Sequence, residues 1–77
     1  MNKLEQILKE TFNVNPPDYT DQTEINQFKE WDSMAHMMLI TRMEDIYHIN
    51  LDGDEIASMN TVGEIKSVLK KHNVLEI

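Results

Sequence analysis

The sequence predicts an all-α protein, a small four-helix bundle with three longer helices, one short helix and a long loop between the first and second helices. Apolar residues recur at helical spacing in three segments, capping boxes open two of these segments, and no segment shows the sustained alternation of a β-strand. The 77 residues suffice for one domain, which we expect to span residues 1–77. A chain of this length buries only about 60% of its unfolded surface, which leaves little room for an internal catalytic pocket.

The first helix is expected to begin near Asn2 and to end near Asn13. Asn2 and Glu5 have the spacing of a capping box, in which each side chain accepts a hydrogen bond from the other residue's backbone N–H group. The prolines at positions 16 and 17 cannot continue a helix, because proline lacks the N–H donor. The apolar stripe of this helix consists of Leu4, Ile7, Leu8 and Phe12.

A long polar connection, residues 14–31, separates the first helix from the second. Connections of this length are uncommon in compact domains, and they usually carry function or are disordered. Ile25, Phe28 and Trp31 recur at every third residue, so the second half of the segment should pack against the helices. We therefore expect an ordered loop rather than a flexible linker.

The second helix should begin at Asp32 or Ser33, both favoured N-cap residues, and should end near His48 or Ile49. Its predicted buried face comprises Leu39, Ile40, Met43, Ile46 and Tyr47, which follow helical spacing. Its predicted outward face comprises Met34, Met37, Met38, Thr41, Glu44, Asp45 and His48. This outward face is apolar near Ser33 and acidic toward its far end.

The last part of the chain predicts a short helix followed by a longer one. LDGDEIASM, residues 51–59, reads as a turn at Gly53 and a short helix with Asp54 as a possible cap. The final helix should open at Thr61, which forms a capping box with Glu64. Its buried stripe would be Ile65, Val68 and Leu69, and the residues that suit the negative end of its dipole are Lys70, Lys71 and His72.

Fourteen acidic residues against seven basic ones give the chain a net charge of −7. Residues 11–33 and residues 34–60 each hold five acidic residues and one basic residue, so the negative charge is concentrated on the two segments that meet at Ser33. This charge disfavours binding to nucleic acid and would attract basic patches on partner proteins. An acidic surface that only maintains solubility would explain the same distribution.

The chain has no cysteine, which excludes disulfides and thiolate metal sites. Its first ten residues, MNKLEQILKE, do not resemble a signal peptide. Its longest uninterrupted apolar run, Met37 to Ile40, is far too short to cross a bilayer. We therefore expect a soluble, cytoplasmic protein, and a monomer.

The DGDE segment, residues 52–55, does not fit a calcium loop. An EF-hand counted from Asp52 would need a liganding side chain where Ile56 lies and a glycine where Ala57 lies. An acidic turn that caps a helix is the better interpretation. No ligand cluster is predicted from the histidines, which lie on different elements or faces: His36, His48 and His72.

Asp32, Ser33 and His36 are close in sequence but are not predicted to form a hydrolytic triad. A catalytic base must itself be oriented and an oxyanion hole must be supplied, and the sequence indicates neither. His36 is expected to pack at the flank of the buried face. A small serine hydrolase would instead turn over an activated ester and lose that activity in His36→Ala.

Ser33 has the position of an attachment site for a phosphate ester. Free backbone N–H groups and the helix dipole favour negative charge at a helix N-terminus. Asp32 would hold or activate the Ser33 hydroxyl during modification, and the outward methionines would form an adaptable apolar surface around the attached group. The alternative is an N-cap serine on a helix that is buried on both faces.

The segment WDSMAHMMLITRMEDIYHINLDGDEIASMNTVGEI, residues 31–65, resembles the acyl carrier protein family. The family has Asp-Ser-Leu at the start of its second helix, which Asp32, Ser33 and Met34 match here. LITRMEDIYHINL is similar to the remainder of that helix, and TVGEI, residues 61–65, is similar to the opening of the family's final helix. The first helix and the long loop also fit, so the resemblance covers nearly the whole chain.

The resemblance implies that a phosphopantetheinyl transferase, using coenzyme A and magnesium, attaches 4'-phosphopantetheine to Ser33. The protein would then hold acyl or aminoacyl groups as thioesters and would catalyse nothing itself. The resemblance also implies an acyl cleft between the second and third helices, lined by Met43, Ile56 and Met59. The surface that docks on basic patches of acyl-loading and acyl-processing enzymes would comprise Met34, Met37, Met38, Thr41, Glu44 and Asp45.

Three departures from the family's pattern favour a specialised pathway slightly over fatty-acid synthesis. Met34 replaces the usual leucine, Trp31 is bulkier than the residue that commonly precedes Asp-Ser, and no acidic residue precedes Glu44 in the second helix. Polyketide, peptide, D-alanyl or aminoacyl, and glycan-modification pathways stay open. The rival hypothesis is an unmodified helical interaction module that binds a partner groove with its methionine-rich face. The effect of Met37→Glu on modification would help to separate the two.

Overall fold

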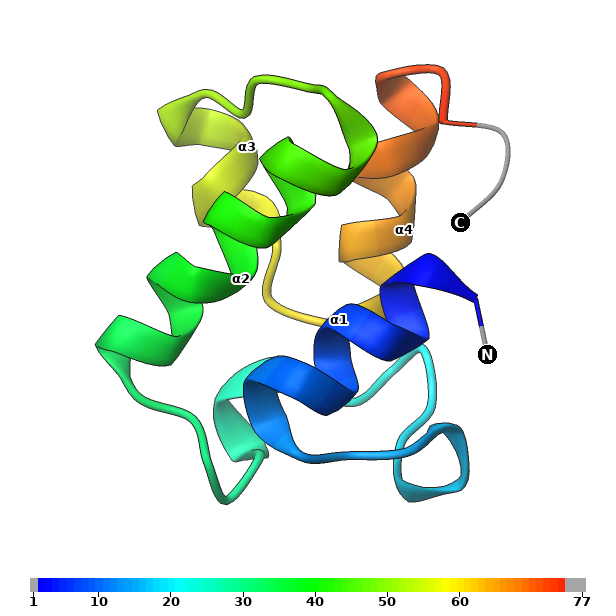
Figure 1. Cartoon of the computed structure of the whole chain (residues 1–77), viewed down its shortest axis with the longest axis vertical. Helices are drawn as coiled ribbons and strands as arrows, with labels where there is room; N and C mark the ends of the chain where they lie inside the picture. The colour runs from blue at the N-terminus through cyan, green and yellow to red at the C-terminus, as the bar shows by residue number, and fades with distance from the viewer. Residues whose placement is uncertain (1, 75–77) are drawn as a thin grey trace.

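The computed structural model describes residues 2–74, and its regular secondary structure over that range is helical. The helices are α1 (Lys3–Phe12), α2 (Ser33–Tyr47), α3 (Gly53–Ser58) and α4 (Val62–Lys71) (Figure 1). The 3-10 turns η1 (Pro16–Asp18) and η2 (Ile25–Gln27) lie in the loop between α1 and α2. The predicted all-α architecture, with a short third helix and a long first loop, is confirmed. Residue 1 and residues 75–77 of the expected domain lie outside the described residues.

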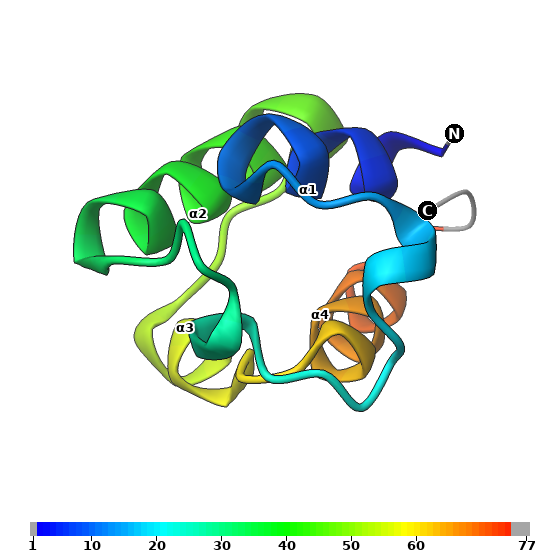
Figure 2. The ribbon, with the colours of Figure 1, turned by 90° about the horizontal axis from the view of Figure 1, so that it is seen from below.

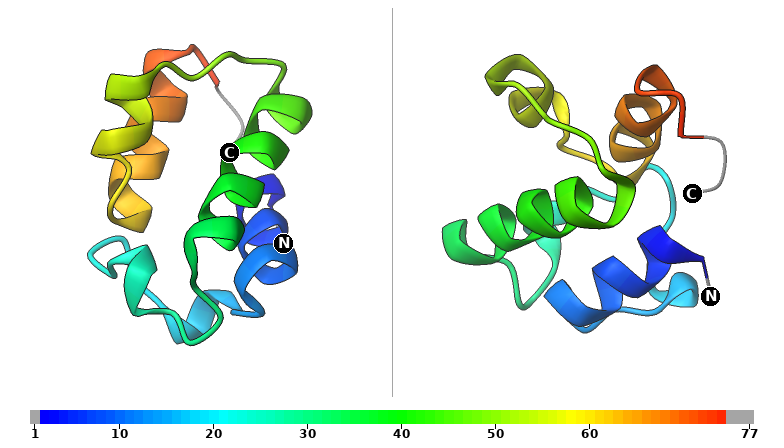
Figure 3. Two further views of the ribbon diagram at one scale, coloured as in Figure 1. Left: turned by 90° about the vertical axis from the view of Figure 1, so that its left-hand side faces the viewer. Right: turned by 45° about the horizontal axis from the view of Figure 1, so that its top comes forward.

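The helices surround one apolar core. α1 lies beside α2 on one side of the molecule, and α3 and α4 lie on the other side (Figure 2, Figure 3). The loop of residues 14–31 closes the end of the bundle at which α2 begins (Figure 3). The apolar side chains of the core come from the helices and from both long connections: Leu4, Ile7, Leu8, Phe12, Ile25, Phe28, Ala35, Leu39, Ile40, Met43, Leu51, Met59, Val62, Ile65, Val68 and Leu69.

Local capping explains where α1 and α4 begin and where α1 ends. Asn2 Oδ1 accepts a hydrogen bond from the Glu5 N–H at 2.8 Å, and Glu5 Oε1 accepts one from the Asn2 N–H at 2.9 Å. Thr61 and Glu64 form the same reciprocal pair at α4, as the sequence predicts. Asn13 ends α1 in the left-handed conformation, with φ of 58°, which a short polar side chain tolerates.

The start of α3 differs from the prediction. Its N-cap is Asp52, whose Oδ1 accepts a hydrogen bond from the Glu55 N–H at 2.8 Å, so the choice of Asp54 was wrong. Asp52 caps the helix because a glutamate lies three residues after it and returns the hydrogen bond to its backbone N–H at 3.2 Å. Asp54 lies inside the first turn, where its charge complements the helix dipole.

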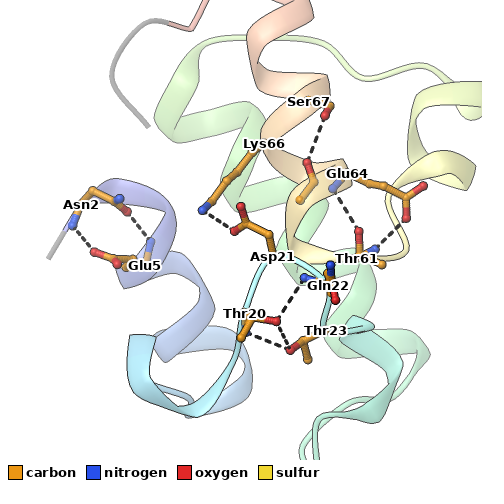
Figure 4. A network of polar contacts seen from close by, with 11 residues as sticks. Asn2, Glu5, Thr20, Asp21, Gln22, Thr23, Thr61, Glu64, Lys66 and Ser67 are labelled. Carbon is orange, nitrogen blue, oxygen red and sulfur yellow. Dashed lines mark hydrogen bonds and ion pairs between the residues drawn. The ribbon is translucent and has the colours of Figure 1, made fainter.

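The long loop is ordered by its contacts with the start of α4, as expected. The Ile25 N–H donates to the Asn60 carbonyl at 2.9 Å, and the Val62 N–H donates to the Thr23 carbonyl at 3.1 Å. Lys66 Nζ and Asp21 Oδ1 form an ion pair at 2.6 Å across the same junction (Figure 4). These contacts fix the path of the loop, and the side chains of Ile25 and Phe28 enter the core.

The buried face of α2 differs from the prediction at two residues. Ile46 is 39% exposed, whereas Ala35, which was not predicted, is buried. Ile46 lies about 60° around the helix from Met43, at the edge of the apolar stripe and in the last turn, where the core no longer covers it. Tyr47 is only partly buried, and it packs against the core.

Candidate functional site

Ser33 is the first residue of α2, and its side chain is exposed. The capping role belongs to Asp32, whose extended backbone turns its Oδ1 toward the Ala35 N–H, at 2.7 Å. The Ser33 hydroxyl has no hydrogen-bond partner within residues 2–74. Ser33 is therefore not the N-cap that the alternative interpretation required, and its hydroxyl is accessible.

The backbone around Ser33 is suited to a phosphate ester. Asp32 accepts the N–H groups of Ala35, through its carboxylate, and of His36, through its carbonyl at 2.9 Å. The N–H groups of Ser33 and Met34 have no partner in the described part of the chain. Two free donors and the positive end of the helix dipole thus lie at the serine, and both favour a negatively charged group there.

The three methionines that follow Ser33 face solvent. Met34 is 74% exposed, Met37 56% and Met38 41%, so α2 is not buried on both faces. Thr41 and Asp45 are also exposed and continue the same surface toward the end of the helix. We call Met34, Met37 and Met38 the methionine patch. An exposed apolar patch beside an accessible serine is typical of a surface that binds another molecule.

Glu44 differs from the other residues of the predicted outward face. It is half-buried, and its Oε2 accepts a hydrogen bond from the Leu51 N–H at 2.9 Å. Glu44 therefore orders the connection after α2 and is only partly available to a partner. No local signal in the sequence indicates this contact, because the two residues lie beyond one helical turn of each other.

The three residues of the rejected triad are not assembled for hydrolysis. The Asp32 carboxylate caps α2, and the His36 ring lies against Trp31, edge to face, with ring centroids 6.3 Å apart. His36 is partly buried, in accord with its expected place at the flank of the core. Trp31 Nε1 is buried without a hydrogen-bond partner, a detail that the sequence did not predict.

The residues predicted to line an acyl cleft lie in or against the core. Met43 and Met59 are fully buried, and Ile56 is a partly buried residue packed against them and their neighbours. A cavity of about 410 Å³ lies elsewhere, between α3 and α4. The residues that line it are mostly of polar types, namely Asp54, Glu55, Ser58, Glu64, Ser67, Val68 and Lys71.

Glu55 is a buried carboxylate that the sequence analysis missed. It is 7% exposed, and its Oε2 lies 2.7 Å from Nε2 of His72, at the end of α4. Lys71 Nζ is 3.8 Å from the same oxygen and is largely in solvent. The pair joins the short helix α3 to α4 beside the cavity. The capping box with Asp52 is the one signal in the sequence that singles out Glu55.

Other kinds of site find no support in residues 2–74. No group of three or more histidine, cysteine, aspartate or glutamate side chains there could hold a metal ion. The helices in that range are too short or too polar to cross a membrane.

The chain is similar to known proteins in its sequence and in its fold. The chain is 27% identical over 71 residues to the acyl carrier protein of Lactobacillus acidophilus, and the match covers 92% of this chain and 89% of that protein. Its structure is similar to the solution NMR structure of holo acyl carrier protein from Geobacter metallireducens. That match has a TM-score of 0.76 and 29% identity, and it covers 88% of this chain and 78% of the other. No family model matches the sequence.

Both of these similar proteins are acyl carrier proteins, which are carriers rather than enzymes, and the helical fold of this chain matches the fold of the solved one. The chain is thus similar to acyl carrier proteins in both sequence and fold.

Proposed function

We propose that Ser33 carries 4'-phosphopantetheine and that the protein presents acyl or aminoacyl groups to partner enzymes as thioesters on this arm. The observation that carries the proposal is the exposed, unpaired Ser33 hydroxyl at the start of a helix that Asp32 already caps. A structurally similar acyl carrier protein is described as holo, which supports a prosthetic group. When bound, the arm supplies the thiol that forms the thioester, and this chain has no cysteine of its own.

The residues around Ser33 suit the attachment step. A transferase that uses coenzyme A and magnesium would form a phosphodiester at Ser33 Oγ as the hydroxyl loses its proton and the nucleotide leaves. The free N–H groups of Ser33 and Met34 would then stabilise the negative charge of the ester. Asp32 holds the first turn in place, and as the neighbour of Ser33 in sequence it would hold or activate the hydroxyl during transfer.

The docking surface in this proposal extends from Ser33 along the exposed side of α2. It comprises Met34, Met37, Met38, Thr41 and Asp45, with a smaller contribution from the half-buried Glu44. The net charge of −7 would steer the protein toward basic patches on the transferase and on acyl-loading and acyl-processing enzymes. Flexible methionine side chains would then adapt to each partner in turn.

The kind of pathway is inferred from the same surface. The first three turns of α2 hold no acidic side chain, which weakens charge pairing near Ser33. We therefore favour a specialised pathway, such as polyketide, peptide, aminoacyl or glycan-modification chemistry, over fatty-acid synthesis. The inner cleft would involve Met43, Ile56 and Met59, and it would have to open, since two of these are fully buried. We propose that the protein acts as a cytoplasmic monomer.

The test is the intact mass after incubation with coenzyme A, magnesium and a permissive phosphopantetheinyl transferase. We expect a gain of one phosphopantetheine unit in the wild type and none in Ser33→Ala. Ser67→Ala is the matched control, because Ser67 is also exposed on a helix but its hydroxyl donates to the Gly63 carbonyl at 3.1 Å. Circular dichroism should show that both variants fold.

Failure of several transferases to load the wild type would contradict the proposal. The function best supported would then be the second candidate, an unmodified interaction module that binds a partner through the exposed methionine patch. Met37→Glu helps to separate the two, because a charge in the docking surface should slow loading only if loading occurs through that surface.

A further inference from the structure

The methionines of this protein fall into two groups of opposite exposure. The sequence has six, and Met1 lies outside the described residues. Met43 and Met59 have no exposed surface, whereas Met34, Met37 and Met38 are 74%, 56% and 41% exposed. The accessible thioether sulfurs of residues 2–74 are therefore gathered at one place, immediately after Ser33.

The methionine patch is a continuous surface. Met34 lies three and four residues before Met37 and Met38, and side chains at these spacings are neighbours on a helix. The chain has no cysteine, so before an arm is attached to Ser33 no thiol of the protein competes with these sulfurs for an oxidant. Methionine sulfoxide is polar, and it can be reduced back enzymatically.

We propose that Met34, Met37 and Met38 form a reversible oxidation site that controls docking at Ser33. This inference rests on the proposed function. The oxidant is hydrogen peroxide. A methionine sulfur attacks one peroxide oxygen, the S–O bond forms as the O–O bond breaks, and the second oxygen leaves as water after it takes a proton. The sulfur is oxidised by two electrons and the peroxide is reduced by two. Two thiols of a reducing system restore the thioether, and release water and a disulfide.

Oxidation should weaken docking without unfolding the protein. A sulfoxide must lose bound water when a partner covers it, whereas a thioether gains from being covered. Met43 and Met59 are shielded by the core, so the fold should stay intact. The Ser33 hydroxyl is chemically unchanged, so the turnover number of loading should change little. We expect the KM of the transferase for the carrier to rise about tenfold, the loss that corresponds to removing one well-buried apolar contact.

The experiment compares untreated and peroxide-treated full-length protein. Peptide mapping by mass spectrometry locates the added oxygens, circular dichroism follows the fold, and loading with coenzyme A, magnesium and the transferase gives KM and kcat. The matched variant is M34L/M37L/M38L, which keeps Met1, Met43 and Met59 and replaces the patch by residues of similar size that peroxide does not oxidise. Each protein is compared only with its own untreated form. Treatment with both stereospecific methionine sulfoxide reductases and a thiol tests reversal.

Support for the proposal would be oxygen on Met34, Met37 and Met38 together with a raised KM in the wild type, no rise in the triple variant, and recovery after reduction. Oxidation of the patch with KM unchanged would overturn the inference while the proposed function stands. Faster oxidation of Met43 or Met59, or loss of the helical spectrum, would also overturn it. Failure to load the untreated protein would overturn the proposed function first, and the inference with it.

Discussion

At the scale of single residues, the position of Ser33 depends on which of two neighbouring residues caps α2. Asp32 and Ser33 are both favoured N-cap residues, so composition leaves the choice open. The backbone decides it: Asp32 is extended, with φ of −153° and ψ of 178°, and its carboxylate reaches the Ala35 N–H. Ser33 is thereby moved into the first turn, and its hydroxyl is not used by the helix.

Tyr47 provides a residue-scale prediction about pH. Burial of the phenol disfavours its charged form and raises its pKa from 10.0 to about 12. Because the folded pKa lies above the unfolded one, this contribution to stability is complete below pH 10 and is lost as the pH rises toward 12. The free energy of unfolding, measured by urea denaturation, should fall over this range by no more than about 1.4 kcal/mol per pH unit from this residue.

Tyr47→Phe is the control for that prediction. The variant cannot ionise at position 47, so its stability should fall less between pH 10 and pH 12 than that of the wild type. Tyr19 also has a raised pKa, through burial and then the nearby charges of Glu5, Asp18 and Asp21, and it titrates in both proteins. Equal losses of stability in the wild type and in Tyr47→Phe would contradict the assignment of the raised pKa to Tyr47.

At the scale of elements, the helices were predictable because their signals are local. The capping boxes and the apolar spacing that determine α1 and α4 each involve residues that are only a few positions apart in the sequence. The errors arise where distant segments decide the outcome. Glu44 accepts a hydrogen bond from the Leu51 N–H, and Glu55 contacts His72, which lies 17 residues away in the sequence. Ile46 is exposed because the core ends there. The start of α2 and the exposure of its first three methionines were predictable in the same way, from capping residues and helical spacing.

Gly63 gives a prediction about how the long loop is held on α4. Its N–H donates to the Asp21 carbonyl at 2.8 Å, and a Cβ at position 63 would lie 2.9 Å from that same oxygen. The obstacle is backbone, which cannot rotate away. Gly63→Ala should therefore lower the free energy of unfolding by about 1–3 kcal/mol, as measured by urea denaturation.

Gly53→Ala is the matched substitution for Gly63→Ala. Gly53 is also in the first turn of a helix, and a Cβ there meets no atom within 4 Å. Alanine at position 53 should raise the free energy of unfolding of the protein by about 0.4–1 kcal/mol, since it reduces the conformational freedom of the unfolded chain. Similar changes in the free energy of unfolding for Gly53→Ala and Gly63→Ala would mean that the loop moves easily away from α4.

The Glu55–His72 pair gives a second element-scale prediction, because it joins α3 to α4. Glu55→Ala removes the contact with His72 and one half of the capping box, so it should cost about 1–3 kcal/mol of stability. Glu55→Gln keeps an acceptor for the Asp52 N–H and should cost less. Urea denaturation of Glu55→Ala, His72→Ala and the double variant measures the coupling. Additive costs would show that the two side chains do not stabilise each other.

At the scale of the whole molecule, the charge of −7 is spread over a body only 28 × 25 × 21 Å in extent. The same field that would steer the carrier toward basic partners also repels itself and weakens the compact state. At 10 mM salt the screening length is about 30 Å, so nearly every charge acts on every other one; at 0.1 M it falls to about 10 Å. Fold stability and partner attraction should therefore respond to salt in opposite directions.

Raising sodium chloride from 10 mM to 300 mM should increase the melting temperature, because screening removes more repulsion than attraction in a chain with twice as many acidic as basic residues. Differential scanning calorimetry of the full chain makes the measurement. The control variant is Glu30→Gln with Asp45→Asn, two exposed acids that form no ion pair within residues 2–74. It should melt at a higher temperature than the wild type at 10 mM and gain less from added salt. A melting temperature that falls with salt would mean that attractive charge pairs, such as Lys66 with Asp21 and Lys71 with Glu55, outweigh the net repulsion.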